Sequence, residues 1–289
     1  MIYKGLTKQT LEAEYNLVAR RGANSLATLM TQWTLRSALS RDQLKAKLNI
    51  SYGREPREKL DLFHSGKPNG PLLVYIHGGY WQRGDKHLYS FLADAYVKHG
   101  ISVAVLNYGL APKTPIGEIP IQIRRAITWL WKNAADLGFS RDQFHLMGHS
   151  AGGHLTAMML ATDWSVYDRE LPTEIVTSAI PISGVFELEP LIHTSLNEAL
   201  ELNADKAISI SPSQMEIKST APQLVIVGAN ETTEFHRQAD EYAQKVSQSA
   251  RQVFRYDVPK ADHFDEITIL SDYKSTFFIK TMTLIESTQ

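Results

Sequence analysis

The pattern of hydrophobic and polar positions divides the chain into two parts. Between residue 7 and about residue 48, apolar positions recur with mostly helical spacing, as in Leu11 and Tyr15, and Ser40 stands where an N-cap would begin a further helix. Beyond about residue 60, short apolar runs alternate with helical patterns. The pattern predicts an N-terminal helical arm, residues 1–58, ahead of an α/β body. Docking on the body is the favoured role of the arm's apolar face, and covering a site is the alternative; this face consists of Tyr15, Leu26, Leu29, Trp33 and Leu35.

The body is predicted to contain a mostly parallel sheet. Apolar strand candidates occupy residues 71–77, 102–108, 144–149, 178–185, 223–229 and 252–258, and KLDLF at 59–63 predicts an antiparallel strand ahead of them. Helical patterns occupy residues 86–99, 119–137, 151–161, 235–249 and 271–286. Such alternation is typical of a central sheet covered by helices on both faces. We expect one α/β domain over residues 1–289 with about eight strands, and an irregular excursion over the sheet edge at about residues 187–222.

Composition excludes several classes of partner. The 289 residues include 30 Lys and Arg against 31 Asp and Glu, so no overall field attracts nucleic acid or an anionic membrane. The chain has no cysteine, which excludes disulfides, thiolate metal sites and a cysteine nucleophile. No apolar run approaches the roughly 18 residues that span a bilayer, and the start lacks an apolar signal segment. We expect a cytoplasmic protein, and a homodimer is an open alternative.

A serine motif follows the strand predicted at residues 144–149. The sequence Gly148-His149-Ser150-Ala151-Gly152 is G-x-S-x-G, and a helical pattern begins directly after it. On a strand-turn-helix corner this motif exposes the serine hydroxyl above the sheet, and the glycines leave room for the tight turn. The alternative is a small residue in an ordinary turn. The context favours Ser150 as the nucleophile of a hydrolase.

Candidate partners for the serine follow later strands. Asn230-Glu231-Thr232-Thr233-Glu234 comes after the strand at 223–229, and Ala261-Asp262-His263-Phe264 comes after the last strand. In the order serine, acid, histidine, His263 is the candidate base and Glu231 the candidate acid. Glu234 remains an alternative acid, Asp257 lies within the last strand, and Asp262 and Asp265 flank the histidine.

A glycine pair follows the apolar run at 71–76. Acyl transfer needs N–H donors at the oxygen that becomes negative, and the Ala151 N–H is well placed to supply one. His77-Gly78-Gly79 stands where the other donors are expected, on Gly78 and Gly79. Tyr80 and Trp81 come next and would either contact an aromatic leaving group or pack in the core. Arg83, Lys86 and other cations are open candidates for a substrate carboxylate.

These motifs resemble the α/β-hydrolase superfamily, close to the hormone-sensitive-lipase-like esterases. More narrowly, the HGGYW run at 77–81 with Gly84-Asp85-Lys86 is similar to the arylformamidases, also called kynurenine formamidases, in which HGGYW is a signature. Residues 183–190, 234–238 and 262–264 agree as well, and the similarity runs from about Leu11 to the C-terminal helix. Where the family usually has an aspartate followed by Ser-Pro-Glu-Phe, this chain has Glu231-Thr232-Thr233-Glu234-Phe235, an alignment that supports Glu231 as the acid.

The resemblance implies an α/β-hydrolase fold and hydrolysis of N-formyl-L-kynurenine, a small aromatic substrate, to kynurenine and formate. It implies that Ser150 attacks the formyl carbon, that the N–H groups of Gly78, Gly79 and Ala151 hold the oxyanion, and that neither a metal nor an organic cofactor takes part. A carboxylesterase or another aryl amidase would use the same residues. A binding protein without catalysis is disfavoured because a serine, a carboxylate and a histidine are all present. A metal-dependent hydrolase is disfavoured because the sequence has no H-E-x-x-H cluster.

Overall fold

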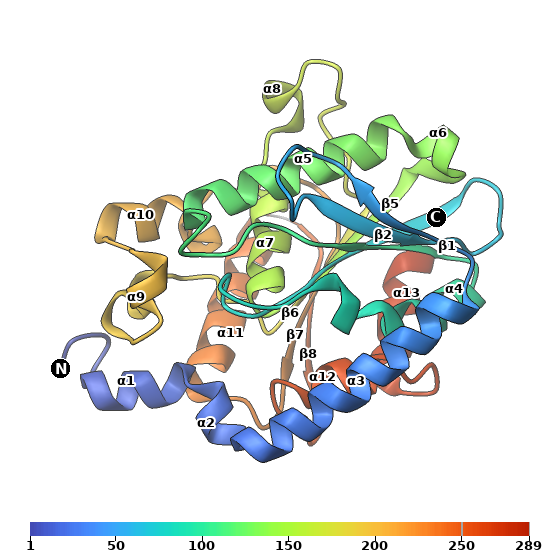
Figure 1. Cartoon of the computed structure of the whole chain (residues 1–289). Coiled ribbons are helices and arrows are strands. Elements are labelled where there is room, and N and C mark those ends of the chain that lie inside the picture. Colours follow the sequence, from blue (N-terminus) through green and yellow to red (C-terminus); the bar gives the residue numbers. More distant parts are fainter. Residues whose placement is uncertain (250, 289) are drawn as a thin grey trace.

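An eight-stranded sheet forms the centre of the protein (Figure 1). The computed structural model describes residues 1–249 and 251–288. The strands are β1 (Ala46–Ser51), β2 (Lys59–Phe63), β3 (Gly70–Ile76), β4 (Ser102–Leu106), β5 (Phe139–His149), β6 (Ser178–Ile182), β7 (Gln223–Gly228) and β8 (Val253–Val258). They lie in the order β1-β2-β4-β3-β5-β6-β7-β8. Strand β2 is antiparallel to β1 and β4, and the other neighbours are parallel.

Helices connect the strands and cover the sheet. The α-helices are α1 (Lys8–Tyr15), α2 (Leu17–Arg21), α3 (Ala23–Gln43), α4 (Ala93–Lys98), α5 (Ile119–Lys132), α6 (Ala134–Leu137), α7 (Ala151–Leu160), α8 (Trp164–Tyr167), α9 (Asn197–Leu200), α10 (Ala204–Ser209), α11 (Thr233–Gln248), α12 (Asp265–Leu270) and α13 (Thr276–Glu286). Short 3₁₀ helices are η1 (Lys86–Leu88), η2 (Ser90–Leu92), η3 (Ile116–Glu118), η4 (Glu189–His193) and η5 (Pro212–Gln214). The mostly parallel α/β sheet predicted from the sequence is confirmed.

Two hydrophobic cores lie on the two faces of the sheet. Along β3, Leu72, Val74 and Ile76 belong to one core, whereas Leu73 and Tyr75 belong to the other. This alternation follows from the two-residue period of a strand, and a strand that is apolar at every position buries both faces. Helices α1, α2, α5, α7 and α11 contribute to the first core, and α3, α4, α12 and α13 contribute to the second. The N-terminal helices therefore reach both sides of the sheet, along the lower border of Figure 1.

The expected helical arm ends earlier than the sequence pattern predicts. Helix α3 ends at Gln43, and Ala46–Ser51 forms edge strand β1, so the prediction of helix to about residue 48 was wrong. Pairing with β2 determines this segment, because tertiary context overrides a short local pattern. Ser40 is not an N-cap either: it lies inside α3, and its hydroxyl donates to the Arg36 carbonyl.

Other element boundaries also shift. Strand β5 begins at Phe139, before the predicted 144–149, and the helix predicted at 86–99 is divided into η1, η2 and α4. The C-terminal helix is preceded by a separate α12 at Asp265–Leu270. Residues 187–222 contain η4, α9, α10 and η5, and they pack against α1, α7 and α11. Over residues 1–249 and 251–288, no helix combines the length and apolar composition that crossing a membrane requires.

Candidate active site

Ser150 occupies a strained corner between β5 and α7. Its φ of 58° and ψ of −119° are unusual for a residue other than glycine, and such conformations cost about 1–3 kcal/mol. The Ser150 N–H donates to the Ile182 carbonyl at 2.8 Å, which ties the corner to β6. The strained backbone is therefore fixed by the neighbouring strand.

The glycines around the serine are required by close packing. A Cβ atom on Gly148 would collide with the Gly152 carbonyl, and a Cβ atom on Gly152 would collide with the Ile76 carbonyl. These contacts let α7 start directly against the ends of β3 and β5. The physical reason that the sequence motif has glycine at these positions is thus visible in the structure.

His263 and Glu231 form a buried pair beside the serine. The Nδ1 atom of His263 lies 2.7 Å from Glu231 Oε1, and the Glu231 carboxylate is fully buried. Ser150 and His263 line the same cavity, and the hydrogen bonds of the described residues leave the Ser150 hydroxyl without a partner. Catalytic hydrogen bonds are often long before substrate binds, so this geometry is compatible with proton transfer.

The other acids proposed from the sequence have different partners. Glu234 accepts hydrogen bonds from Tyr15 at 2.9 Å and from Arg237 at 2.7 Å. Asp262 and Asp265 both pair with Arg21. Asp257 has a half-exposed side chain that pairs with Arg255. Of the five carboxylates, the structure therefore brings only Glu231 to the His263 ring.

Two buried residues that the sequence did not indicate support the histidine loop. The His149 Nε2–H donates to the His263 carbonyl at 2.8 Å, and burial together with His263 holds the pKa of His149 well below its usual value. Ser183 donates to the carboxyl group of Glu266, whose Oε2 lies 3.4 Å from His149 Nε2. Burial raises the pKa of Glu266 well above its usual range, and the Glu231 carboxylate adds to the rise. The spacing of Glu266, three residues after His263, is the only sequence signal that could have pointed to it.

One group of potential metal ligands occurs among residues 1–249 and 251–288. It comprises His149, His263 and Glu266, whose ligand atoms lie within 4.8 Å of one another. Hydrogen bonds already engage His149 Nε2, His263 Nδ1 and the Glu266 carboxyl group. The arrangement is explained by positioning of the histidine loop, without a metal.

The glycine loop after β3 is held by His77. Burial lowers the pKa of His77 to about 4, so the ring is neutral, and its Nδ1–H donates to the Gly78 carbonyl at 2.7 Å. In a trans peptide the N–H points opposite to the C=O, so the Gly79 N–H faces away from His77. Gly78 lies against the elbow, since a Cβ there would come within 2.9 Å of Ser150 Cβ. No described residue accepts a hydrogen bond from the N–H of Gly78, Gly79 or Ala151.

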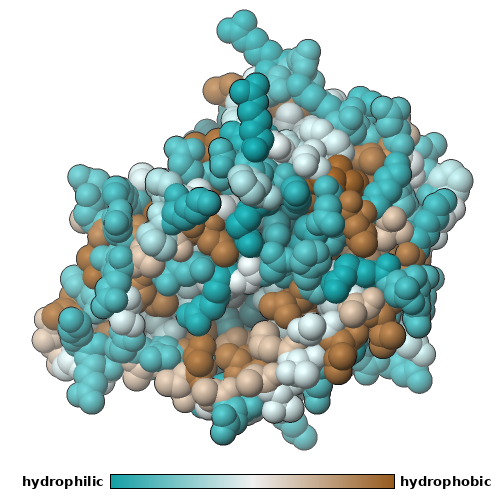
Figure 2. Space-filling view, in the orientation of Figure 1, coloured by the Kyte–Doolittle hydropathy of each residue, from teal (hydrophilic) through white to brown (hydrophobic). Residues whose placement is uncertain are grey.

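A mostly apolar cavity of about 310 Å³ opens beside these groups. The arm supplies one wall of the cavity, with Leu17, Val18, Leu26, Met30 and Trp33. The arm thus both docks on the body and covers the site, although these two roles were predicted as alternatives from the sequence. The face drawn in Figure 2 is hollowed above α2 and α3, and hydrophobic side chains border the hollow.

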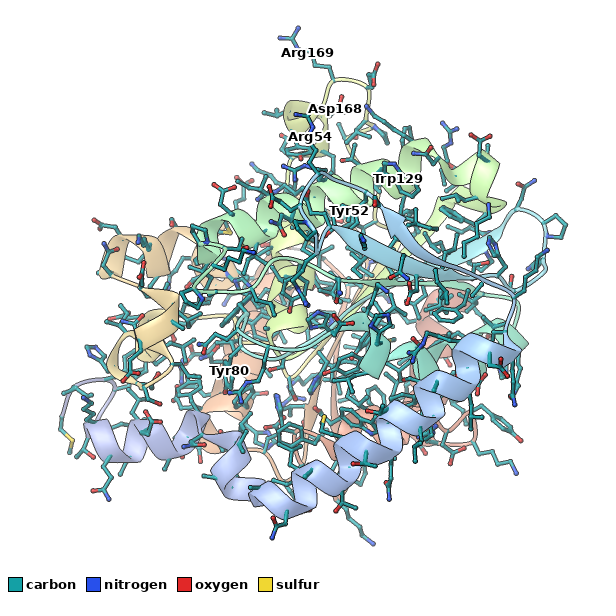
Figure 3. All side chains as sticks on the ribbon, in the orientation of Figure 1. Tyr52, Arg54, Tyr80, Trp129, Asp168 and Arg169 are labelled. Carbon is teal, nitrogen blue, oxygen red and sulfur yellow. The ribbon has the colours of Figure 1, made fainter. Side chains whose placement is uncertain are left out.

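The two aromatic residues after the glycines have different surroundings in the structure. Tyr80 lines the cavity and lies between the N-terminal helices and the sheet (Figure 3), where its hydroxyl donates to the Tyr15 carbonyl. Trp81 is fully buried and meets the His154 ring edge-on at 4.9 Å. A direct substrate contact for Trp81 is therefore corrected to core packing, because Trp81 is fully buried and, unlike Tyr80, is not among the residues that line the cavity.

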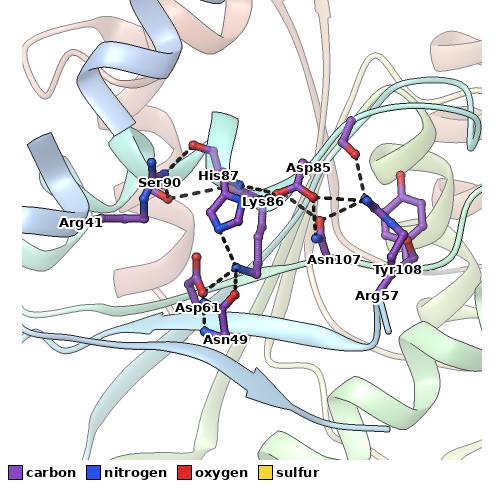
Figure 4. A network of polar contacts seen from close by, with 11 residues as sticks. Arg41, Asn49, Arg57, Asp61, Asp85, Lys86, His87, Ser90, Asn107 and Tyr108 are labelled. Atoms are coloured by element: carbon purple, nitrogen blue, oxygen red, sulfur yellow. Dashed lines mark hydrogen bonds and ion pairs between the residues drawn. The ribbon is translucent and has the colours of Figure 1, made fainter. Parts of the chain in front are cut away.

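Of the two cations considered for a substrate carboxylate, Lys86 is already engaged. Its buried ammonium donates to Asp61 at 2.7 Å and to Asn49 at 2.8 Å, as the close-up in Figure 4 shows. Arg83 lines the cavity instead. The sequence alone did not decide whether Arg83, Lys86 or another cation would bind a substrate carboxylate.

Comparisons with known proteins agree with this geometry. The model of the BD-FAE family matches residues 60–246. A kynurenine formamidase of Danio rerio is 31% identical over 282 residues, covering 93% of this chain and 94% of the relative. The chain belongs to the kynurenine formamidase family of α/β-hydrolases. The resemblance to arylformamidases seen in the sequence is confirmed, and the protein is a hydrolase of the α/β-hydrolase superfamily.

Further members and neighbours extend the same picture. The kynurenine formamidase family includes a Drosophila melanogaster protein that is 28% identical and covers 80% of both chains. A crystal structure from Silicibacter sp. TM1040, described provisionally as a thioesterase, has a TM-score of 0.79 and 34% identity and covers 94% of this chain and 98% of the neighbour. Esterase B from Lactobacillus rhamnosis has a TM-score of 0.71 at 18% identity, covering 91% and 94% of the two chains, and shares the fold.

Proposed function

We propose that the protein is a serine hydrolase that cleaves an aryl formamide such as N-formyl-L-kynurenine to kynurenine and formate. The observation that carries this proposal is the convergence of three features on one apolar cavity: Ser150, the His263–Glu231 pair and the free N–H groups of the glycine loop. The kynurenine formamidase relatives, which match over nearly the whole chain, favour the formamide.

The first half of the reaction forms a formyl ester. Ser150 Oγ attacks the formyl carbon while His263 Nε2 takes its proton, and Glu231 stabilises the resulting imidazolium through Nδ1. The N–H groups of Gly78, Gly79 and Ala151 receive the negative oxygen of the tetrahedral intermediate. His263 then protonates the arylamine nitrogen as the C–N bond breaks, which releases kynurenine.

The second half removes the formyl group. His263 takes a proton from water as the water oxygen attacks the ester carbon, and the proton passes to Ser150 Oγ when the C–O bond breaks. Formate leaves and the enzyme returns to its starting state. An arylamine leaves more easily than an alkylamine, so the machinery of an esterase is sufficient for this bond.

The test is a substrate panel on the purified protein. We expect kynurenine to form from N-formyl-L-kynurenine, and we expect Ser150→Ala to abolish both turnover and labelling by a fluorophosphonate. Ser247→Ala, at an exposed serine of α11, is the matched control and should behave as wild type. A folded wild type that neither labels nor turns over any substrate would overturn the proposal of a serine hydrolase.

A carboxylesterase is the second candidate function. It is favoured by the apolar cavity wall and by the esterases that share the fold. The same assay with short-chain nitrophenyl esters separates the two. A formamide rate many orders of magnitude below the ester rate would assign the protein to the esterases.

We also propose that the protein works in the cytoplasm. The absence of cysteine among all 289 residues supports this location, because disulfides are common in exported proteins and rare in cytosolic ones. Cell fractionation followed by the activity assay tests it.

A further inference from the structure

A strained turn after the oxyanion glycines brings Arg83 to the cavity. Gly79, Tyr80 and Trp81 all have positive φ, at 117°, 50° and 58°, and the N–H groups of Gln82 and Arg83 both donate to the Gly79 carbonyl at 3.0 Å. The turn folds the chain back, so that a Cβ on Gly79 would come within 3.0 Å of Arg83 Cγ. Two non-glycine residues in this conformation cost about 1–3 kcal/mol each, which is typical of a functional constraint.

The residues before Arg83 are used to hold the turn. The Tyr80 hydroxyl donates to the Tyr15 carbonyl at 2.9 Å, the Trp81 carbonyl accepts from Ala111 N–H at 2.8 Å, and the Gln82 amide donates to the Leu196 carbonyl. The Arg83 side chain is exposed, and it makes no hydrogen bond or ion pair with any other described residue. Arg83 is thus the side chain of the turn that remains available to a ligand.

The charge of Arg83 is not balanced within the cavity. Among the described residues that line it, Arg83 is the only lysine or arginine, and none is an aspartate or glutamate. The nearby cations are paired: Lys86 with Asp61, and Arg21 with Asp262 and Asp265. Arg83 is therefore the one lysine or arginine among the described residues that line this mostly apolar cavity, which Gly78, Gly79 and Ser150 also line.

We propose that Arg83 is a specificity-determining residue whose guanidinium binds the carboxylate of an aromatic substrate while the scissile carbonyl lies at Ser150. The aromatic ring would then pack on the apolar wall formed by the arm and Tyr80. This inference rests on the proposed function and deepens it, because it selects substrates that carry a carboxylate at the end remote from the cleaved bond. A guanidinium is suited to this role since it binds carboxylates through two parallel hydrogen bonds.

The experiment measures the preference for substrates that carry a carboxylate over related substrates that lack one. Arg83→Met keeps the aliphatic stem and removes the charge, Arg83→Lys keeps the charge, and Arg169→Met on the distant α8 loop (Figure 3) is the matched control. Each protein is assayed on two pairs. The formamide pair is N-formyl-L-kynurenine and 2-formamidoacetophenone, and the ester pair is 4-acetoxybenzoate and phenyl acetate.

We expect Arg83→Met to lower the ratio of kcat/KM for substrates with a carboxylate over those without one by about 10- to 100-fold, mainly through KM, as for the loss of one charged hydrogen-bonding partner. Arg83→Lys should restore part of the ratio, and Arg169→Met should leave it unchanged. The inference is overturned if both members of a pair lose kcat/KM equally, so that the ratio does not change, or if wild type shows no preference for the members that carry a carboxylate. If only the esters are hydrolysed, the formamidase proposal fails, yet the ester pair still decides the role of Arg83.

Discussion

Two glutamates three positions apart have entirely different surroundings. Glu231 lies in the loop before α11 and reaches the buried His263 ring, whereas Glu234 lies in the first turn of α11 and is held by Tyr15 and Arg237. The difference arises because the loop still follows the end of β7, while the helix has already turned its side chains toward α1. A comparison of the two positions therefore tests the acid directly.

We expect Glu231→Gln to fold and to lose kcat by about 10⁴-fold, because the amide cannot stabilise an imidazolium and favours the wrong tautomer. Glu234→Gln should keep most of kcat and instead lower the thermal stability, since it weakens the contact between α1 and α11. Steady-state kinetics and thermal denaturation of both variants provide the measurement. Normal kcat in Glu231→Gln together with a large loss in Glu234→Gln would show that the acid is misassigned.

For single residues, the sequence predicts the roles of those that belong to local motifs. Ser150 and the glycine loop follow from their places after strands, and Glu231 follows from its distance to the end of β7. His149 and Glu266 were missed because their contacts join the end of β5, the residue after β6 and α12 in space, and the spacing of Glu266 after His263 does not reveal these contacts. Trp81 was ambiguous for the same reason: whether an aromatic side chain meets the core or the cavity depends on how a strained turn orients it.

The N-terminal arm is coupled to the loop that carries His263. Arg21, at the end of α2, donates from one nitrogen to both oxygens of Asp262 at 2.7 Å and to Asp265 at 2.6 Å. These two acids flank the histidine in the sequence and are only partly exposed. The same arm supplies a wall of the cavity, so its contact with this loop links the substrate wall to the candidate base.

We expect Arg21→Ala to lower kcat by about 10-fold, since a partly buried charged hydrogen bond of this kind contributes on the order of 1–3 kcal/mol to the ordered loop. The neighbouring Arg20 is the control, because its one described hydrogen bond goes to the Asn230 carbonyl at 3.3 Å and not to the histidine loop. Kinetics at low and high salt compare the two variants. Equal losses in Arg20→Ala and Arg21→Ala would exclude a specific role for the Arg21 contacts.

Among the elements, the sequence predicts buried strands better than edge elements. Strands β3, β4, β6 and β7 are apolar along most of their length, and each was expected within a few residues of its position, whereas only the apolar second half of β5 was expected. Edge strand β1 was missed because four of its six residues are exposed, and the pattern that remains is indistinguishable from a helix end. The division at residues 86–99 was missed because η1 and η2 owe their shape to the docked α3.

For the whole molecule, the buried histidines should make the free energy of unfolding depend on pH. Burial lowers the pKa of His77, His145 and His154 to about 4 each, and the pKa of His149 is also well below its usual value. These rings are neutral in the folded protein, and in His77, His145 and His154 one nitrogen of the ring has a hydrogen-bond partner, such as the Ile210 carbonyl for His154. Unfolding returns them to water, where an ordinary histidine takes up a proton near pH 6.5.

The free energy of unfolding should therefore fall as the pH drops from about 6.5 toward 4. In this window the unfolded chain binds more protons than the folded one, and each histidine contributes about 1 kcal/mol per pH unit. Glu266 acts in the opposite direction, since its raised pKa makes the folded state bind the extra proton, but one carboxyl group opposes four histidines. Urea unfolding at several pH values measures the slope, and His154→Gln, whose amide can still donate to Ile210, should reduce it by about 1 kcal/mol per pH unit. A stability that is constant from pH 7 to 4.5, or that rises on acidification, would mean that these histidines are protonated in the fold.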